Sequence, residues 1–258
     1  MTKEDKWSTA DFEKSPIIRD LFPLTKYFLN YTDWPGIDDY QHLFKEHQLD
    51  LTPVPQSTVI SDFEDQYEPR VYLKRELQTR TRNWHDFFNA MIWLKFPQTK
   101  SILNNLHYTQ AMTRPKGSNR SLLENRITQF DECGAIIISK KSSLLDLVEQ
   151  HKWRQLFIDS DNEFEDNFYC VVFGHAIYEK ALTPYIGMTC HCLLIQNDEL
   201  LDTVLQQNTD PLDHLVAQWW KTHSKHKHIT LYPYPILGTP GYWPDQNNTF
   251  YQNTQYFR

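Results

Sequence analysis

Glycine is scarce in this sequence, and long apolar runs are absent from it. Only 7 of the 258 residues are glycine, so we do not expect a glycine-rich loop of the kind that cradles nucleotide phosphates. No stretch approaches the ~20 consecutive apolar residues that cross a bilayer. The charged start, MTKEDKW, is not followed by an apolar segment of signal-peptide length. We therefore expect a soluble cytoplasmic protein that has no membrane partner.

Cysteine is also rare. Cys133, Cys170, Cys190 and Cys192 form no CxxC pair and lie among apolar residues, a pattern typical of reduced thiols in a cytosol. His191 lies between two of these cysteines. Successive side chains of a strand point to opposite faces, so on a strand this trio would be poorly placed to chelate one metal ion.

Aromatic and other apolar residues, by contrast, are abundant. Hydrophobic residues make up 40% of the chain and aromatic residues 14%, which indicates a globular interior rather than disorder. The length of 258 residues allows one large domain or two small ones. Because we find no internal repeat and no linker, we favour a single domain.

The segment 79–100, TRTRNWHDFFNAMIWLKFPQTK, predicts a buried helix around which the chain is organised. Asn83 is a suitable N-cap, and Pro97 ends the pattern about four turns later. Most of the intervening positions are apolar. A helix that is apolar nearly all round is typical of a protein core.

Polar residues on this helix gather on one side. His85, Asp86, Asn89 and Trp93 fall within an arc of roughly 100°, at about 100° per residue. Burial of an imidazole, a carboxylate and a carboxamide costs a few kcal/mol each unless partners satisfy them. We therefore expect polar partners from elsewhere in the chain.

Two later segments supply candidate partners. The segment 168–182, FYCVVFGHAIYEKAL, is compatible with a helix, on which His175 and Glu179 would lie one turn apart on the inward face. Asp131 and Glu132 precede Gly134, where we expect a turn. Each of these residues also has a purely structural interpretation, as a helix cap, an exposed turn or a buried pair that fixes packing.

These polar residues suggest two kinds of chemistry. Two histidines with a carboxylate can bind a divalent metal, the one cofactor that the pattern suggests. Without a metal, a carboxylate that orients an imidazole can support acid/base catalysis. The candidate metal ligands are His85, His175 and Glu179. The candidate catalytic residues are His85, Asp86, Asn89, Asp131, His175 and Glu179.

The charge of the chain is unevenly distributed. The net charge is -7, yet residues 68–126 hold 11 Lys+Arg against 4 Asp+Glu. Basic residues beside a candidate site suggest an anionic small-molecule ligand, such as a phosphate or a carboxylate, although a solvated face would explain them equally well. The candidate substrate-binding residues are Arg80, Arg82, Trp93, Lys100 and Lys180.

For the fold, we predict a single α+β domain, mostly helical, with a small mixed sheet. The expected strands lie near residues 67–74, 134–139 and 188–195. A doubly wound sheet is the alternative, but the elements do not repeat as β-α-β units. Residues 1–66 would form a helical extension that packs on a core of residues 67–258.

A series of short motifs resembles a known family. In order along the chain, these motifs are RNWHD (82–86), FNA (88–90), FP and TK (96–100), Thr128 with FDE and Gly134, FGHA (173–176) with Glu179-Lys180, and LG with PG (237–241). They resemble the bacterial family called domain of unknown function 3025, over roughly residues 67–258. Where that family has an Arg-Asp pair, this chain has Glu124-Asn125, and Gly241-Tyr242 replaces a Gly-Trp pair. The resemblance implies a bacterial protein and carries no assigned activity.

Three functions remain open at this point. The first is a metal-assisted or acid/base hydrolase that acts on an anionic, phosphate-bearing substrate. The second is a non-enzymatic binding protein that uses segment 68–126 for RNA or another acidic partner, although the overall acidity and the lack of an RRM, KH or zinc-knuckle signature argue against it. The third is a structural or interaction protein with a buried polar network. The sequence does not indicate an oligomeric state.

Overall fold

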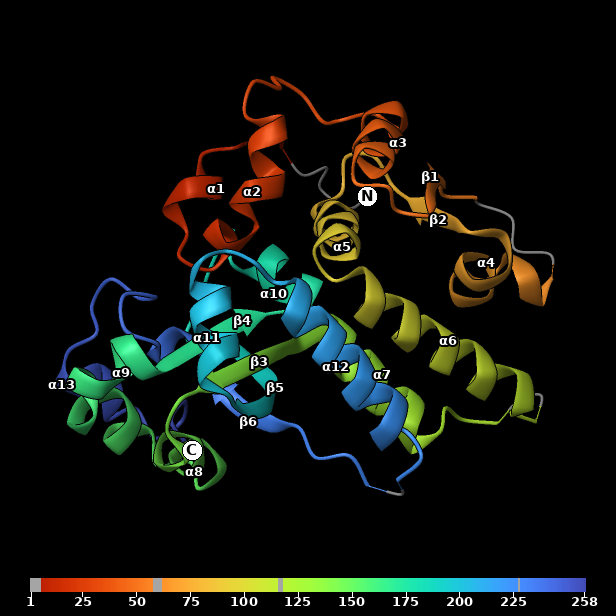
Figure 1. Cartoon of the computed structure of the whole chain (residues 1–258). Coiled ribbons are helices and arrows are strands. Elements are labelled where there is room, and N and C mark those ends of the chain that lie inside the picture. Colours follow the sequence, from red (N-terminus) through yellow and green to blue (C-terminus); the bar gives the residue numbers. More distant parts are fainter. Residues whose placement is uncertain (1–5, 58–61, 116–117, 227) are drawn as a thin grey trace.

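The computed structural model describes residues 6–57, 62–115, 118–226 and 228–258 (Figure 1). The first five residues of the charged start lie outside this part. Strands are β1 (Thr52–Pro55), β2 (Glu76–Thr79), β3 (Gly134–Ser139), β4 (Phe168–Val172), β5 (Thr189–Gln196) and β6 (Tyr232–Pro235). Helices are α1 (Asp11–Lys14), α2 (Phe22–Thr25), α3 (Ile37–Glu46), α4 (Tyr67–Lys74), α5 (Trp84–Lys95), α6 (Pro97–Thr113), α7 (Leu122–Cys133), α8 (Ser142–Glu149), α9 (Asp161–Asn167), α10 (His175–Lys180), α11 (Asp198–Leu205), α12 (Asp210–His223) and α13 (Asn248–Tyr251). Short 3-10 or π turns are η1 (Ile18–Leu21), η2 (Lys26–Phe28), η3 (Phe63–Asp65), η4 (Gln155–Asp159) and η5 (Ile236–Gly238).

The main sheet is mixed and has the strand order β4-β3-β5-β6. β3 pairs in parallel with β5, with Ile136 opposite Leu193, and antiparallel with β4. β6 pairs antiparallel with β5 and closes the other edge. Every residue of β3 is buried, which agrees with its unbroken apolar run GAIIIS. The predicted α+β domain with a small mixed sheet is confirmed, and the antiparallel pairs at both edges exclude a doubly wound parallel sheet.

Two local predictions were wrong. Residues 67–74 form helix α4 instead of a strand, because Pro69 falls in the first helical turn, where its missing N–H costs nothing. Residues 168–172 form strand β4 instead of a helix, because this apolar run hydrogen-bonds to the edge of β3. Only His175–Lys180 remains helical. The strands at residues 134–139 and 188–195 are confirmed.

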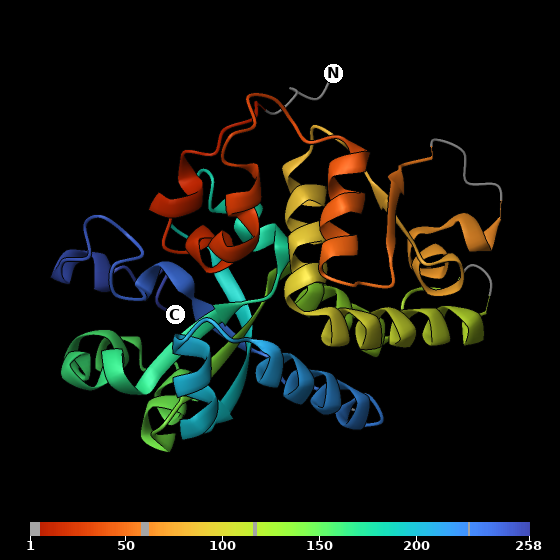
Figure 2. The same cartoon turned by 45° about the horizontal axis from the view of Figure 1, so that its top comes forward.

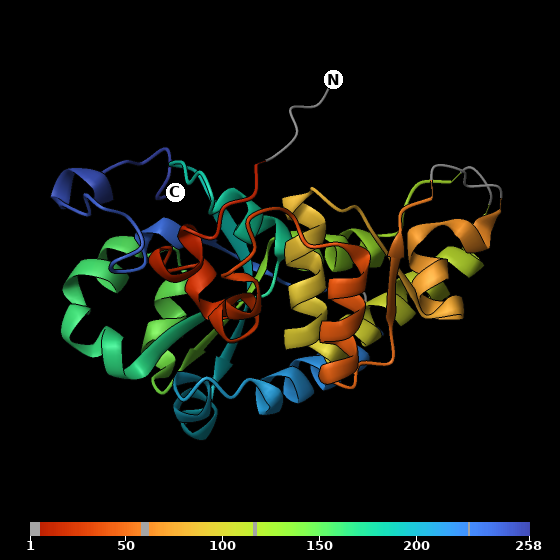
Figure 3. The ribbon, with the colours of Figure 1, turned by 90° about the horizontal axis from the view of Figure 1, so that it is seen from above.

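The central helix forms as expected. The Asn83 side chain accepts a hydrogen bond from Asp86 N at the start of α5, and Pro97 begins α6 directly after it. Figures 2 and 3 show α3 alongside α5, and α12 runs beside α6 in Figure 1. A buried carboxylate on α12, Asp213, accepts hydrogen bonds from the first backbone N–H groups of α6 at Gln98 and Thr99. These hydrogen bonds attach α12 to the start of α6, the helix that follows α5 directly.

The N-terminal segment covers the outer face of α5. Trp7 stacks on Trp84 with ring centroids 5.0 Å apart, and Phe12 stacks on Phe87 at 5.7 Å. The parallel pair β1-β2 and α4 lie on the side away from the main sheet (Figures 1 and 2). No helix in the described ranges has the length and apolar content to span a membrane.

Candidate metal centre

Three helix ends meet where α5, α7 and α10 converge. The first turn of α5 contributes His85, the last turn of α7 contributes Glu132, and the first residue of α10 is His175. The expected turn at residues 131–133 is instead the final turn of α7, and this helical geometry directs Glu132 toward the two histidines. Backbone contacts lock the junction, because Phe173 N and Gly174 N both donate to Gly134 O, at 3.0 and 2.8 Å.

The three side chains present their ligand atoms to one point. His85 Nε2 and His175 Nε2 are 2.9 Å apart, and Glu132 Oε2 lies 3.5 Å from His175 Nε2 and 3.8 Å from His85 Nε2. Three atoms with this spacing lie about 2 Å from a common centre, close to the ~2.0–2.2 Å at which Zn²⁺ binds imidazole nitrogen and carboxylate oxygen. Within the described residues, these three side chains form the group whose geometry could hold a metal ion.

Carboxylates lie behind both imidazole rings. The His85 Nδ1–H donates to Glu179 Oε2 at 2.9 Å, which leaves the Nε2 lone pair free to bind a metal. His175 Nδ1 is buried without a hydrogen-bond partner in the described part of the chain, and Asp131 Oδ2 lies 3.9 Å away. In many metal sites a carboxylate hydrogen-bonds to the ring of a metal-binding histidine. This carboxylate orients the ring and raises the basicity of the imidazole.

The protonation of the histidines differs. The hydrogen bond that His85 donates to Glu179 raises the pKa of His85 above its ordinary value, with the charges of Glu132 and Asp86 acting in the same direction. Burial lowers the pKa of His175 to about 3, although Asp131 opposes this shift. His175 is therefore neutral at physiological pH and keeps a lone pair for a metal, as a ligand must.

The buried ammonium group of Lys100 contacts two polar residues next to the cluster. Lys100 Nζ donates to Asp131 Oδ1 at 2.6 Å and to Asn89 Oδ1 at 3.0 Å, and its charge lies over the Trp93 ring, 5.2 Å from the centroid. Asn89 in turn donates to the Tyr67 hydroxyl at 2.7 Å. Burial alone would raise the pKa of Asp131, but Lys100 and His175 together hold it below its ordinary value. Asp131 is thus a carboxylate in the folded protein.

The cluster opens onto a cavity of about 320 Å³. His175 is almost fully covered, with 4% of its side chain exposed, whereas His85 and Glu132 are 28% and 38% exposed and face solvent. A metal bound here would keep an open coordination position on the cavity side, as in catalytic zinc sites. The cavity is lined by Gln56, Tyr67, Glu68, Gln78, Arg80, His85, Asp86, Asn89, His107, Arg120, Thr128, Asp131, Glu132 and His175.

Most of the residues suggested for substrate binding contact other parts of the protein. Arg80 lines the cavity, but its guanidinium is clamped by both oxygens of Asp86, at 2.7 and 3.0 Å. Arg82 pairs with Asp33 outside the cavity, and Lys180 donates to Cys133 Sγ at 3.6 Å. Trp93 and Lys100 border a small space beneath the cavity floor. A clamp for an anion built from these five residues remains a prediction without further support.

Arg120 is the arginine that the sequence argument missed. It lines the cavity, and its side chain makes one long hydrogen bond of 3.4 Å, to Thr128 Oγ1, with no carboxylate at ion-pair distance among the described residues. The basic RNA-binding alternative gains no support from the cavity, where Glu68, Asp86, Asp131 and Glu132 outnumber the arginines.

Tertiary structure brings together most of the predicted site residues. His85, Asp86, Asn89, Asp131 and His175 all line the cavity, and Glu179 contacts His85 from behind. Glu132 joins the histidines where Glu179 was expected to do so. The sequence argument also missed Glu68 and His107 as lining residues. The position of Glu132 beside Asp131 in the FDE motif could have identified it as a site residue. No sequence pattern identified Glu68 or His107 as site residues.

Gly174 is expected to be essential for the geometry of this cluster. A Cβ at this position would lie 2.5 Å from both Cys133 N and Gly134 N, and closer still to Glu132 O. These are backbone atoms, so Gly174→Ala must push α10 away from α7, which separates His175 from Glu132. We expect a loss of roughly 3 kcal/mol in the free energy of unfolding, measured by urea denaturation, and weaker metal binding.

Gly36→Ala provides the matched control. Gly36 also precedes a helix, but a Cβ there would meet only Asp39 Oδ2, at an ordinary 3.6 Å. We expect this variant to lose about 1 kcal/mol or less. Equal stability of the Gly174 variant and wild type would contradict the close backbone contact at the α7–α10 junction.

Comparisons with known proteins agree with the motif series. Residues 51–258 match the family model described as Protein of unknown function (DUF3025), and the match begins earlier than the motifs alone indicated. No curated protein and no solved structure matches the chain. Because the match to the family model covers well over half of the sequence, including every residue of the His85–Glu132–His175 cluster, the chain belongs to the DUF3025 family.

Proposed function

We propose that this protein is a metal-dependent hydrolase whose divalent metal is held by His85, His175 and Glu132. The observation that carries the proposal is the convergence of three ligand atoms, 2.9 to 3.8 Å apart, at the wall of a cavity. Two imidazole nitrogens at 2.9 Å must share a proton or a cation, because two bare lone pairs would repel each other. The Glu132 carboxylate at this point also favours a bound cation.

The chemistry follows from the open position. A metal with three protein ligands and one water lowers the pKa of that water to about 7, and so supplies hydroxide for attack on a carbonyl or phosphoryl centre. Glu179 would fix the His85 ring through its Nδ1–H, and Asp131 would do the same for His175 after a small movement. Both ring positions would then be set before substrate enters.

Two further cavity residues suit such a reaction. Burial, with the nearby charge of Asp131, raises the pKa of Glu68 to about 7, a value suited to proton transfer near neutral pH. Asn104 donates to Glu68 Oε2 at 2.6 Å and orients it. Arg120 would bind an anionic group of the substrate, such as a phosphate or a carboxylate, beside the metal.

Metal analysis of the wild-type protein tests the proposal. Untagged protein purified without chelators should contain close to one equivalent of a transition metal, or should bind one equivalent of Zn²⁺, Mn²⁺ or Fe²⁺ after chelator treatment, as measured by elemental analysis and calorimetry. The metal-loaded protein would then be screened against phosphomonoesters, phosphodiesters and carboxylate-bearing amides. A folded protein that binds none of the three metals would refute the proposal.

Metal-free acid/base catalysis is a second candidate, and the 2.9 Å distance between the imidazoles also supports it. In that case an imidazolium at His85, stabilised by Glu179, donates a hydrogen bond to neutral His175. The same screen separates the two candidates, since this chemistry would persist in the presence of EDTA.

A further inference from the structure

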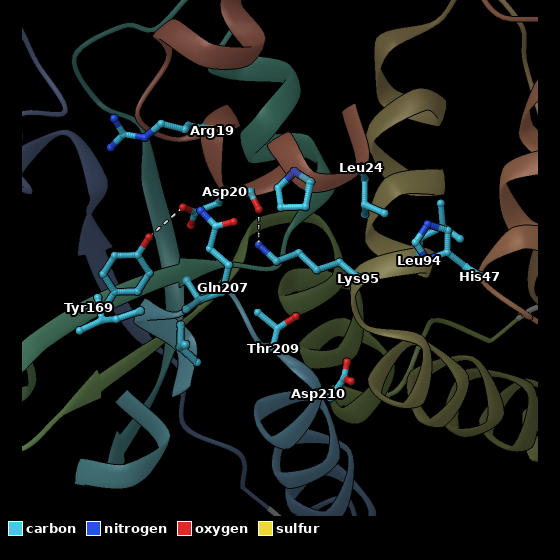
Figure 4. A pocket seen from close by; sticks show the side chains of 14 residues that line it. Arg19, Asp20, Leu24, His47, Leu94, Lys95, Tyr169, Gln207, Thr209 and Asp210 are labelled. Carbon is cyan, nitrogen blue, oxygen red and sulfur yellow. Dashed lines mark hydrogen bonds between the residues drawn. The ribbon is translucent and has the colours of Figure 1, made fainter. Parts of the chain in front are cut away.

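A second pocket lies at the opposite end of α5. Its volume is about 410 Å³, within the range of small-molecule sites, which is roughly 300–1,000 Å³. It shares no lining residue with the metal cavity, and Lys95 is ten positions after His85, which corresponds to about 15 Å of helix. Elements η1 and α2 from the N-terminal segment close it against β4 and the loop between α11 and α12 (Figure 4).

Lys95 extends into this pocket from the last turn of α5. Its Nζ donates one hydrogen bond, to the backbone oxygen of Asp20 at 2.7 Å (Figure 4). No carboxylate of the described residues lies at ion-pair distance from this half-buried ammonium, which lies 5.7 Å from the centroid of the Phe96 ring. Burial lowers the pKa of Lys95, and the more distant charge of Asp20 only partly opposes this. A larger fraction of this amine is therefore neutral and nucleophilic than for an exposed lysine.

A carboxyl group and a phenol that share a hydrogen bond also line this pocket. Tyr169 OH donates to Asp20 Oδ1 at 2.8 Å, and Figure 4 shows Lys95 and Tyr169 approaching Asp20 from opposite sides. Burial raises the pKa of Asp20, with Lys95 and Tyr169 opposing this shift. The pocket thus combines an amine that has no carboxylate partner among the described residues with a carboxyl group that is hydrogen-bonded to a phenol.

We propose that Lys95 forms a Schiff base with a small aldehyde or ketone that binds in this pocket. The Nζ lone pair attacks the carbonyl carbon, and one of the two amine protons is transferred to the carbonyl oxygen by way of Asp20, which gives a carbinolamine. Loss of the second amine proton and of the hydroxyl group, which leaves as water after protonation, completes the C=N bond. This sequence requires no oxidant and no co-reactant, and it requires only an amine of low pKa and a nearby proton donor.

Each residue has a defined role in this step. Lys95 is the nucleophile and Asp20 carries the proton to the departing hydroxyl group, while Tyr169 orients the Asp20 carboxyl group. Asp20 belongs to the N-terminal segment, which precedes the residues that match the family model. Lys95 and Tyr169 lie within the matched residues, so the site is composed of both parts of the chain.

Trapping by reduction tests the proposal on the full-length wild-type protein. Protein at pH 7 would be incubated with glyoxylate or with acetaldehyde in separate reactions, each with sodium cyanoborohydride, and adducts would be mapped by peptide mass spectrometry. We expect Lys95 to be labelled at least tenfold faster than exposed lysines, because an ordinary lysine, with a pKa near ~10.4, is almost fully protonated at pH 7. Its labelling should also begin at lower pH.

Internal and variant controls accompany this experiment. Exposed Lys26 lies nearby on η2 and reports the background rate, and Lys100, held by Asp131 and Asn89, should stay unlabelled. Asp20→Asn should slow labelling at Lys95 without changing labelling at Lys26. Lys95→Met should remove the fast-labelled site while the fold, checked by circular dichroism, persists. Labelling of wild-type Lys95 no faster than Lys26 with both carbonyl compounds would overturn the proposal, whatever the variants do.

Discussion

Alanine at His85 or at His175 is expected to abolish stoichiometric metal binding, while the protein stays folded. Each histidine supplies one of three protein ligands, and their Nε2 atoms are only 2.9 Å apart. Loss of either leaves two ligands, too few for a stable zinc-type site. Elemental analysis of both variants, purified in parallel with wild type, should find metal near background, and any metal-dependent hydrolysis should disappear with it.

Carboxylate variants make this prediction quantitative. Glu132→Gln removes the third ligand charge and should weaken binding severely, whereas Glu179→Gln changes only the partner of His85 Nδ1 and should cost about 10–100-fold in affinity. The matched control is His107→Gln, which alters a buried histidine on the same cavity wall but outside the cluster. Retention of metal by His85→Ala and its loss from His107→Gln would show that the wrong residues have been assigned.

Lys100→Met is expected to destabilise the fold by about 3–5 kcal/mol, because it leaves a buried carboxylate without its counter-charge. The Lys100 side chain is 4% exposed and that of Asp131 is 18% exposed. The substitution also removes the donor to Asn89 Oδ1 and the cation over the Trp93 ring. Urea denaturation followed by circular dichroism measures the change, and an accompanying loss of metal affinity would follow from the displaced Asp131–His175 contact.

A double variant isolates the cause. In Lys100→Met with Asp131→Asn, the methionine fills the space of the lysine stem and no unpaired charge remains. We expect much of the lost stability to return, because a buried ion pair contributes little net stability compared with neutral residues of similar size. If the double variant were as unstable as Lys100→Met alone, lost packing rather than the unpaired Asp131 would explain the defect.

Local sequence signals account for the elements that carry the site. Asn83 and Pro97 bound α5 because an amide cap and a proline act within one or two turns of their own positions. The unbroken apolar run of β3 indicates a strand buried on both faces, as the structure shows. The same local reasoning failed for α4 and β4. In α4, Pro69 in the first helical turn outweighed an alternation of side chains that had suggested a strand. In β4, hydrogen bonding to β3 outweighed a helix-like spacing of apolar residues.

The sequence alone determined that His85 and His175 are unusual, because each interrupts an apolar pattern with an imidazole that needs a partner. It did not determine which carboxylate completes the trio. Only the tertiary structure decided that α7 continues to Cys133 and directs Glu132 inward, while Glu179 lies behind His85. The Lys95 pocket likewise depends on Asp20 and Tyr169, which are far from it in the chain. Periodicity and capping act over a few residues, whereas the convergence of side chains depends on how distant elements pack, so sequence could identify these groups but not assemble them.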